Sequence, residues 1–148
     1  MNKVAMVTNF ATLAFLFAFL IVLPAAHADK ANQATKVTFN QPVQIPGRVL
    51  PAGTYWFVLP DAITQHNQVR IFSSDRATLY ATVFTIDAER QQPTDHTTFT
   101  FAVRGSAQPQ AIVTWFYPGD TTGHEFLYPK HVWKELAKDK QDTVVAGD

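Results

Sequence analysis

Cysteine is absent from the 148 residues of this chain. The absence excludes disulfide bonds, thiolate metal ligands and a cysteine nucleophile. An excess of one charge is also lacking, because 12 Lys and Arg balance 12 Asp and Glu. Since there is no basic run either, we expect neither a nucleic acid nor an anionic membrane surface as a partner. The Gly-x-Ser-x-Gly motif of serine hydrolases is missing, and no cofactor is expected.

One long apolar run is present, at the N-terminus. Lys3 gives a positive start, residues 4–23 are nearly all apolar, and Ala26-His27-Ala28 supplies the small residues that a signal peptidase accepts. We therefore expect residues 1–28 to be a cleaved signal peptide and the protein to be exported, to the periplasm or outside the cell. An uncleaved anchor is the alternative, since about 20 apolar residues can span a bilayer. No later segment is long enough, so no membrane span is expected after cleavage.

The stretch 45–59 organises the rest of the chain. It places two Pro/Gly turn signals, at Pro46-Gly47 and at Pro51-Ala52-Gly53, immediately before an apolar run. Large side chains occupy both alternating faces of residues 55–59. This pattern predicts the central strand of the core, with Trp56 facing a second layer.

Alternation with a period of two predicts the other strands. Residues 79–86 are apolar on both faces, so deep burial is expected there as well. Pro42 cannot donate a ladder hydrogen bond, so its strand should lie at an edge or bulge there. Pro129 suits the first position of a short amphipathic helix over residues 130–140. The expected strands are 36–45, 55–59, 68–73, 79–86, 97–103, 111–117 and 124–128.

These elements predict one all-β domain over residues 36–140. Turn signals, Pro118-Gly119 among them, join the strands and no crossover helices intervene, which indicates an antiparallel β-sandwich or small barrel of about seven strands with one short C-terminal helix. Residues 29–35 are expected to be a flexible leader and residues 141–148 a flexible tail.

Histidines raise the possibility of a metal site. His124 follows Asp120 by four residues, precedes Glu125 directly, and is joined by His131 on the predicted helix. Their spacing matches no ligand signature such as His-x-His or His-Glu-x-x-His. Surface imidazoles are the simpler interpretation, and no metal site is predicted.

Aromatic residues make up 13% of the chain and favour strands and cores. Trp56 and Phe116 lie on the faces opposite to their core-facing neighbours. They either pack against a second layer or line a groove for a glycan, peptide or apolar ligand. With Asp120 and His124 in a neighbouring polar loop, they are the predicted binding residues, and no catalytic residue is predicted.

Several phrases of the chain resemble a set of small secreted bacterial proteins of unknown function. The resemblance spans nearly the whole predicted domain, and it implies export and an all-β fold without any catalytic residue. The phrases are Phe39-Asn40-Gln41-Pro42-Val43-Gln44-Ile45-Pro46-Gly47, Leu50-Pro51-Ala52-Gly53-Thr54-Tyr55, Leu79-Tyr80-Ala81-Thr82, Trp115-Phe116-Tyr117-Pro118-Gly119 and Glu125-Phe126-Leu127-Tyr128-Pro129-Lys130.

These observations predict an exported, non-catalytic module that binds a ligand or an envelope partner through the loops at residues 87–96 and 120–124. One alternative is a metal-dependent hydrolase that uses His124, Glu125 and Asp120. Another is a structural envelope protein that associates with itself through an edge strand at residues 36–45.

Overall fold

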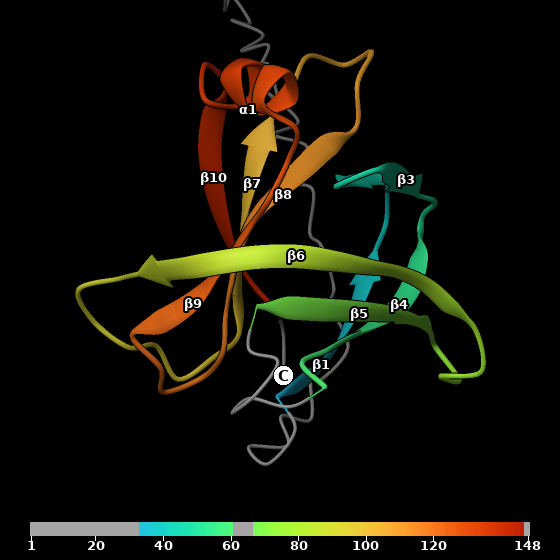
Figure 1. Cartoon of the computed structure of the whole chain (residues 1–148), viewed down its shortest axis with the longest axis vertical. Coiled ribbons are helices and arrows are strands. Elements are labelled where there is room, and N and C mark those ends of the chain that lie inside the picture. The colour runs from blue at the N-terminus through green and yellow to red at the C-terminus, as the bar shows by residue number, and fades with distance from the viewer. Residues whose placement is uncertain (1–32, 61–66, 147–148) are drawn as a thin grey trace, which may run out of the picture.

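The computed structural model describes residues 33–60 and 67–146, so the predicted signal peptide lies outside the described residues. The described residues form ten strands and one short helix (Figure 1). None of their helices is long and apolar enough to cross a membrane. In chain order the elements are β1 (Ala34–Phe39), β2 (Val43–Ile45), β3 (Arg48–Leu50), β4 (Gly53–Val58), β5 (Gln68–Ser73), β6 (Leu79–Glu89), β7 (Thr98–Val103), β8 (Gln110–Phe116), β9 (Thr122–Phe126), α1 (Lys130–Leu136) and β10 (Lys140–Val145).

The predicted all-β class is confirmed. Hydrogen bonds connect the strands in the order β1-β4-β5-β6-β9-β8-β2-β3, while β7 joins β8 and β10 joins β7. The sheet does not close into a barrel. All the described pairings are antiparallel except that of β2 with β8, which the prediction of an antiparallel fold did not include.

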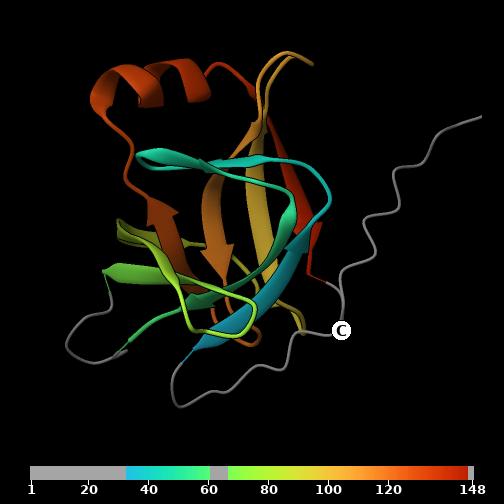
Figure 2. The same cartoon turned by 90° about the vertical axis from the view of Figure 1, so that its right-hand side faces the viewer.

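Strand β6 links two halves of this sheet. Its first part pairs with β5, and its last five residues pair with β9. It crosses the front of the molecule in Figure 1. In Figure 2, β1 and β4 cross in front of β7 and β8. The core lies between these halves, because the ring of Phe57 on β4 is 5.4 Å from that of Phe99 on β7 and 6.3 Å from that of Trp115 on β8.

Strand β4 occupies the interior position that the sequence predicted, between β1 and β5. Its inner face is buried, as Phe57 shows, but Trp56 on the other face is only half-buried. Within residues 33–60 and 67–146 no second layer covers Trp56, whose indole N–H donates to the Ser74 carbonyl at 3.0 Å. The prediction that Trp56 faces a second layer is therefore wrong, because alternating apolar residues do not reveal whether a covering layer exists.

Strand β6 also differs from the prediction of deep burial. Leu79, Phe84 and Ile86 expose 50%, 56% and 48% of their surfaces, and only Val83 and Thr85 are buried. The strand is a bridge along the surface, with one of its faces turned to solvent. Apolar side chains on both faces of a sequence segment do not by themselves imply two covering layers.

The predicted strand at residues 36–45 is two strands. The chain breaks at residues 40–42, where Pro42 cannot support a ladder, and passes from the edge beside β4 to the edge of β8. The predicted leader also forms structure from Ala34 onward, since β1 begins there.

The prediction of a flexible tail from residue 141 is wrong for the described residues up to 146. Strand β10 covers the free edge of β7, with the hydroxyl groups of Thr100 and Thr143 3.1 Å apart. The chain therefore leaves α1 at Leu136, earlier than predicted, and returns along β7. The partner that orders residues 140–145 is the edge of β7, which is distant in sequence. The polar composition of the tail therefore does not predict this strand.

The turns predicted at Pro46-Gly47 and Pro118-Gly119 are confirmed. Gly47 and Gly119 have φ angles of 83° and 79°, which glycine adopts without a Cβ clash. At the Pro118-Gly119 turn the Asp120 N–H donates to the Tyr117 carbonyl at 3.3 Å. Helix α1 follows Pro129 and buries Leu136 at one end of the core.

Tyr128 fills a gap along one edge of β8. Along this edge β2 pairs with residues 110–111 and β9 with residues 114–115. Between them the Tyr128 hydroxyl lies 2.7 Å from the Ile112 carbonyl and 3.0 Å from the Gln44 carbonyl. The single hydroxyl proton can be shared between these two backbone acceptors.

Replacing Tyr128 with phenylalanine should lower the free energy of unfolding by about 2 kcal/mol, because buried carbonyls lose their donor. Burial raises the pKa of the Tyr128 hydroxyl above 10.0, and Arg104 opposes this only in part. The folded state therefore holds the proton more tightly than the unfolded state does. The stabilisation should be complete below about pH 10 and decline at higher pH.

Urea denaturation of wild type and Tyr128→Phe at neutral pH and above pH 10 measures this difference. Tyr80→Phe is the control, since Tyr80 is half-buried and its hydroxyl makes no hydrogen bond with the described residues. An equal loss in both variants, or a difference that grows above pH 10, would contradict the assignment.

Candidate functional site

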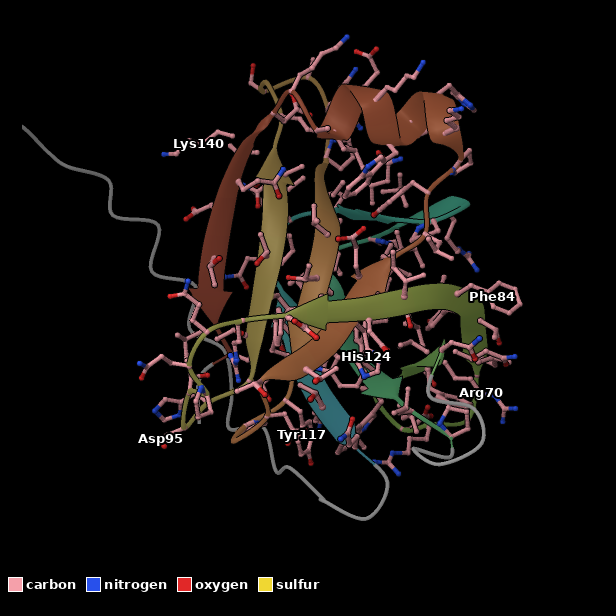
Figure 3. All side chains as sticks on the ribbon, turned by 60° about the vertical axis from the view of Figure 1, so that its left-hand side comes forward. Arg70, Phe84, Asp95, Tyr117, His124 and Lys140 are labelled. Carbon is pink, nitrogen blue, oxygen red and sulfur yellow. The ribbon has the colours of Figure 1, made fainter. Side chains whose placement is uncertain are left out.

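A hollow of about 400 Å³ opens where β6 ends and β9 begins; we call it the polar hollow. It brings together Asp120 and His124, two of the predicted binding residues, with Asp87 from the predicted recognition loop. Figure 3 shows His124 beside β6. The lining residues are Gln33, Leu59, Asp87, Gly119, Asp120, Thr121, Thr122 and His124.

Sheet register and a turn place the acidic groups of the polar hollow. Asp87 on β6 lies directly opposite His124 on β9, so both side chains project from the same face. Asp120 leaves the turn made by Pro118 and Gly119. The Gln33 amide nitrogen donates to the Asp120 carboxylate at 3.2 Å. The hollow thus joins residues from three distant parts of the chain.

His124 forms a buried wall of the polar hollow, with 9% of its surface exposed. Its ring lies 5.5 Å from the fully buried ring of Trp115, and its Nδ1 atom is 3.5 Å from the Thr85 hydroxyl oxygen. These contacts fix the plane of the imidazole against the core. A ligand therefore meets a pre-oriented ring there.

Arg90 holds the loops beside the polar hollow without lining it. Its Nε atom donates to the Asp120 carbonyl at 2.8 Å, and one terminal nitrogen donates to the Tyr117 carbonyl at 3.1 Å. The other terminal nitrogen donates to the hydroxyls of Thr94 and Thr98 at 2.9 and 3.2 Å. A planar guanidinium can make all these bonds at once. Arg90 is therefore a positioning residue for the turn that carries Asp120.

The environment of Arg90 combines burial with a nearby carboxylate. Burial lowers the pKa of the guanidinium from its ordinary value, and Asp120 opposes this shift. Arginine nevertheless stays charged at neutral pH. Its cation lies 4.7 Å from the centre of the Phe116 ring.

The predicted aromatic residues are placed outside the polar hollow. Phe116, with 8% of its surface exposed, packs under Arg90 on the far face of β8. Trp56 lies on the outer face of β4, where the Arg76 guanidinium stacks 3.9 Å from the centre of its ring. A cation thus covers each of these two rings.

The residues of the alternative metal site do not all meet. Glu125 follows His124 on β9 and projects to the opposite face, where it lines a second hollow with Thr100 and Thr114; of the polar hollow's lining residues, this second hollow shares Asp87. His131 is exposed on α1. Among residues 33–60 and 67–146, no three His, Asp or Glu side chains are close enough together to hold a metal ion.

Sequence reasoning missed Gln33 and did not single out Asp87. Gln33 lies in the predicted leader, and nothing near it in sequence indicates a partner at Asp120. Asp87 was one of several polar residues in a predicted loop, but it lies within β6 and is aligned with His124. The strand register is the missing information, and no local pattern contains it.

The polar hollow offers carboxylates, an imidazole, an amide and threonine hydroxyls. Carboxylates only accept hydrogen bonds, so they suit a ligand that presents hydroxyl or ammonium donors. No Phe, Tyr or Trp is among its lining residues, so its contacts are chiefly polar. Comparison with known proteins adds no assignment: no protein-family model, no curated protein and no solved structure matches this chain.

Proposed function

We propose that this protein is an exported, non-catalytic β module that binds a small ligand bearing hydroxyl and ammonium groups in the polar hollow. One observation carries the proposal: Asp87, Asp120 and His124, from separate elements, line one hollow. Two carboxylates at one site favour a ligand with positive charge. Export is supported by the apolar run and small-residue site in residues 1–28.

Binding without turnover fits the groups that line the hollow. Hydrolysis would require a nucleophile beside a base that is oriented by a third group. The sequence has no cysteine, and its serines lie outside the hollow's lining. The Asp120 carboxylate is bonded to Gln33, and His124 is fixed against Trp115. These fixed groups suit recognition, since a pre-formed site avoids the cost of ordering side chains on binding.

Titration calorimetry with three small sugars tests the proposal. Glucosamine carries an ammonium and hydroxyls, glucose carries hydroxyls alone, and glucuronate carries a carboxylate. We expect the affinity to fall in that order. Asp87→Asn and Asp120→Asn should each weaken glucosamine binding about tenfold, the equivalent of about 1.4 kcal/mol.

Asp142→Asn is the matched control, because Asp142 is an exposed carboxylate on β10 and does not line the hollow. It should leave glucosamine binding unchanged. Failure to bind any of the three sugars, or an equal loss in Asp142→Asn, would overturn the proposed ligand class.

A further inference from the structure

The outward face of β1, β4 and β5 gathers basic side chains around one tryptophan. Lys36 on β1 lies opposite Trp56 on β4, which in turn lies opposite Phe72 on β5. Arg70 is two residues from Phe72, so it projects from the same face, and Figure 3 labels it on β5. Arg76 reaches this face from the turn between β5 and β6. We call Lys36, Trp56, Arg70 and Arg76 the basic face.

Trp56 holds two of these cations in place. The Arg76 guanidinium carbon lies 3.9 Å from the centre of the Trp56 ring, and the Lys36 ammonium lies 5.9 Å from it. The two charges are therefore within about 10 Å of each other, roughly one Debye length at 0.1 M salt. Their attractions for a nearby anion consequently add.

The turn that carries Arg76 is also well defined. Arg76 has a φ angle of 59°, in the left-handed region that glycine and asparagine adopt more readily. The Asp75 carboxylate accepts hydrogen bonds from the Ser73 hydroxyl and from the Ala77 N–H at 3.0 Å. The hydrogen bonds of the Asp75 carboxylate therefore stabilise the turn, and the backbone conformation directs the Arg76 side chain toward Trp56.

The cations of the basic face have no acidic partner within the part of the chain that the structure describes. The ion pairs there join Arg104 to Asp139 and Lys138 to Glu135. Lys36, Arg70 and Arg76 take part in none of them. Because the whole chain carries no net charge, composition does not account for three cations on one sheet face that have no acidic partner among residues 33–60 and 67–146.

We propose that the basic face binds a linear polysaccharide that carries carboxylates, a polyuronate. The cations spread across three strands, a span of about 10 Å, which suits an extended ligand with repeated anions. Arg76 can bind a carboxylate through two nitrogens. Proteins that bind single-stranded nucleic acid stack bases on aromatic rings, and interfacial membrane binders insert apolar side chains. The ring of Trp56 is instead covered by Arg76 and its N–H is bonded to Ser74.

Binding to polygalacturonate at low salt, measured by calorimetry against neutral dextran, tests this site. The triple variant Lys36→Gln, Arg70→Gln, Arg76→Gly removes its three charges, and glycine suits the φ angle at residue 76. The control triple, Lys130→Gln, Lys134→Gln, Lys140→Gln, removes three exposed charges from α1 and β10. We expect at least about a tenfold loss in the first variant and less than about twofold in the second, with wild-type affinity falling as salt rises.

Thermal unfolding of both triple variants shows whether each is folded. If either is not, single substitutions at Lys36 and Arg70 against Lys130 and Lys134 provide the same comparison. Equal losses in test and control variants, or no binding of polygalacturonate at low salt, would overturn the proposal. So would binding of single-stranded DNA or phosphatidylglycerol vesicles with polygalacturonate left unbound. Asp120→Asn should bind polygalacturonate like wild type, which separates this site from the polar hollow.

Discussion

Replacing Gly123 with alanine should lower the free energy of unfolding by about 3 kcal/mol, the upper part of the range for overpacked sites. Gly123 is buried on β9, beside β8. A Cβ atom there would lie 2.5 Å from Cδ1 and 2.7 Å from Cγ of Phe116, and 2.7 Å from the Trp115 carbonyl oxygen. One obstacle is a packed ring and the other is backbone, so neither can be relieved by a small side-chain rotation.

Gly123→Ala should also change the position of residues that line the polar hollow. Phe116 lies beneath the Arg90 guanidinium, and Arg90 bonds the turn that carries Asp120. A displaced ring would therefore move the group that positions Asp120. We expect weaker glucosamine binding in any Gly123→Ala protein that remains folded.

Chemical denaturation with two companion variants tests this account. Gly105→Ala is the control, since a Cβ atom at residue 105 would meet nothing within 4 Å and should change stability by less than about 0.5 kcal/mol. Adding Phe116→Leu to Gly123→Ala should recover part of the loss by making room at the ring. Gly123→Ala stability equal to that of Gly105→Ala would contradict the predicted clash.

The parts of the fold predicted from sequence are those that local chemistry decides. The conformations of Gly47 and Gly119 follow from the residues beside them, and so does the start of α1 after Pro129. The interior position of β4 followed from an apolar run that is strong on its buried face. In each case the deciding interactions lie within a few residues along the chain.

The parts that were missed depend on distant partners. Whether Phe84 and Trp56 are covered depends on whether another layer packs over them, and their apolar character does not reveal this. Strand β10 forms because the edge of β7 needs a partner. The parallel pairing of β2 with β8 likewise depends on where the chain goes after residues 40–42.

The same distinction explains the candidate site. Asp120 and His124 were singled out because they are close in sequence and chemically versatile. Glu125 is closer still to His124, yet the strand alternation sends it to the opposite face. Asp87 reaches His124 only through the register of β6 and β9. A site assembled across strands is therefore only partly visible in the sequence.

Replacing Arg90 with leucine should lower the free energy of unfolding by about 3 kcal/mol and weaken glucosamine binding at least tenfold. The substitution leaves the Asp120 carbonyl without its Arg90 donor, removes one of the two donors to the Tyr117 carbonyl, and removes the cation above Phe116. Arg90 does not line the polar hollow, so its effect on binding would act through Asp120. Asp120→Asn should reproduce the binding loss with a smaller loss of stability.

Arg90→Lys separates charge from geometry. Lysine keeps the positive charge but cannot donate to Tyr117, Asp120 and Thr98 together from a planar fork, so it should recover less than half of either loss. Arg70→Leu is the control for removing an arginine, because Arg70 has no hydrogen-bonding partner among the described residues and should change stability by less than about 0.5 kcal/mol. Wild-type behaviour of Arg90→Lys would mean that charge alone matters and that the fork does not position Asp120. If Arg90→Leu is less stable but binds glucosamine with unchanged affinity, Arg90 stabilises the fold and does not position Asp120 for binding.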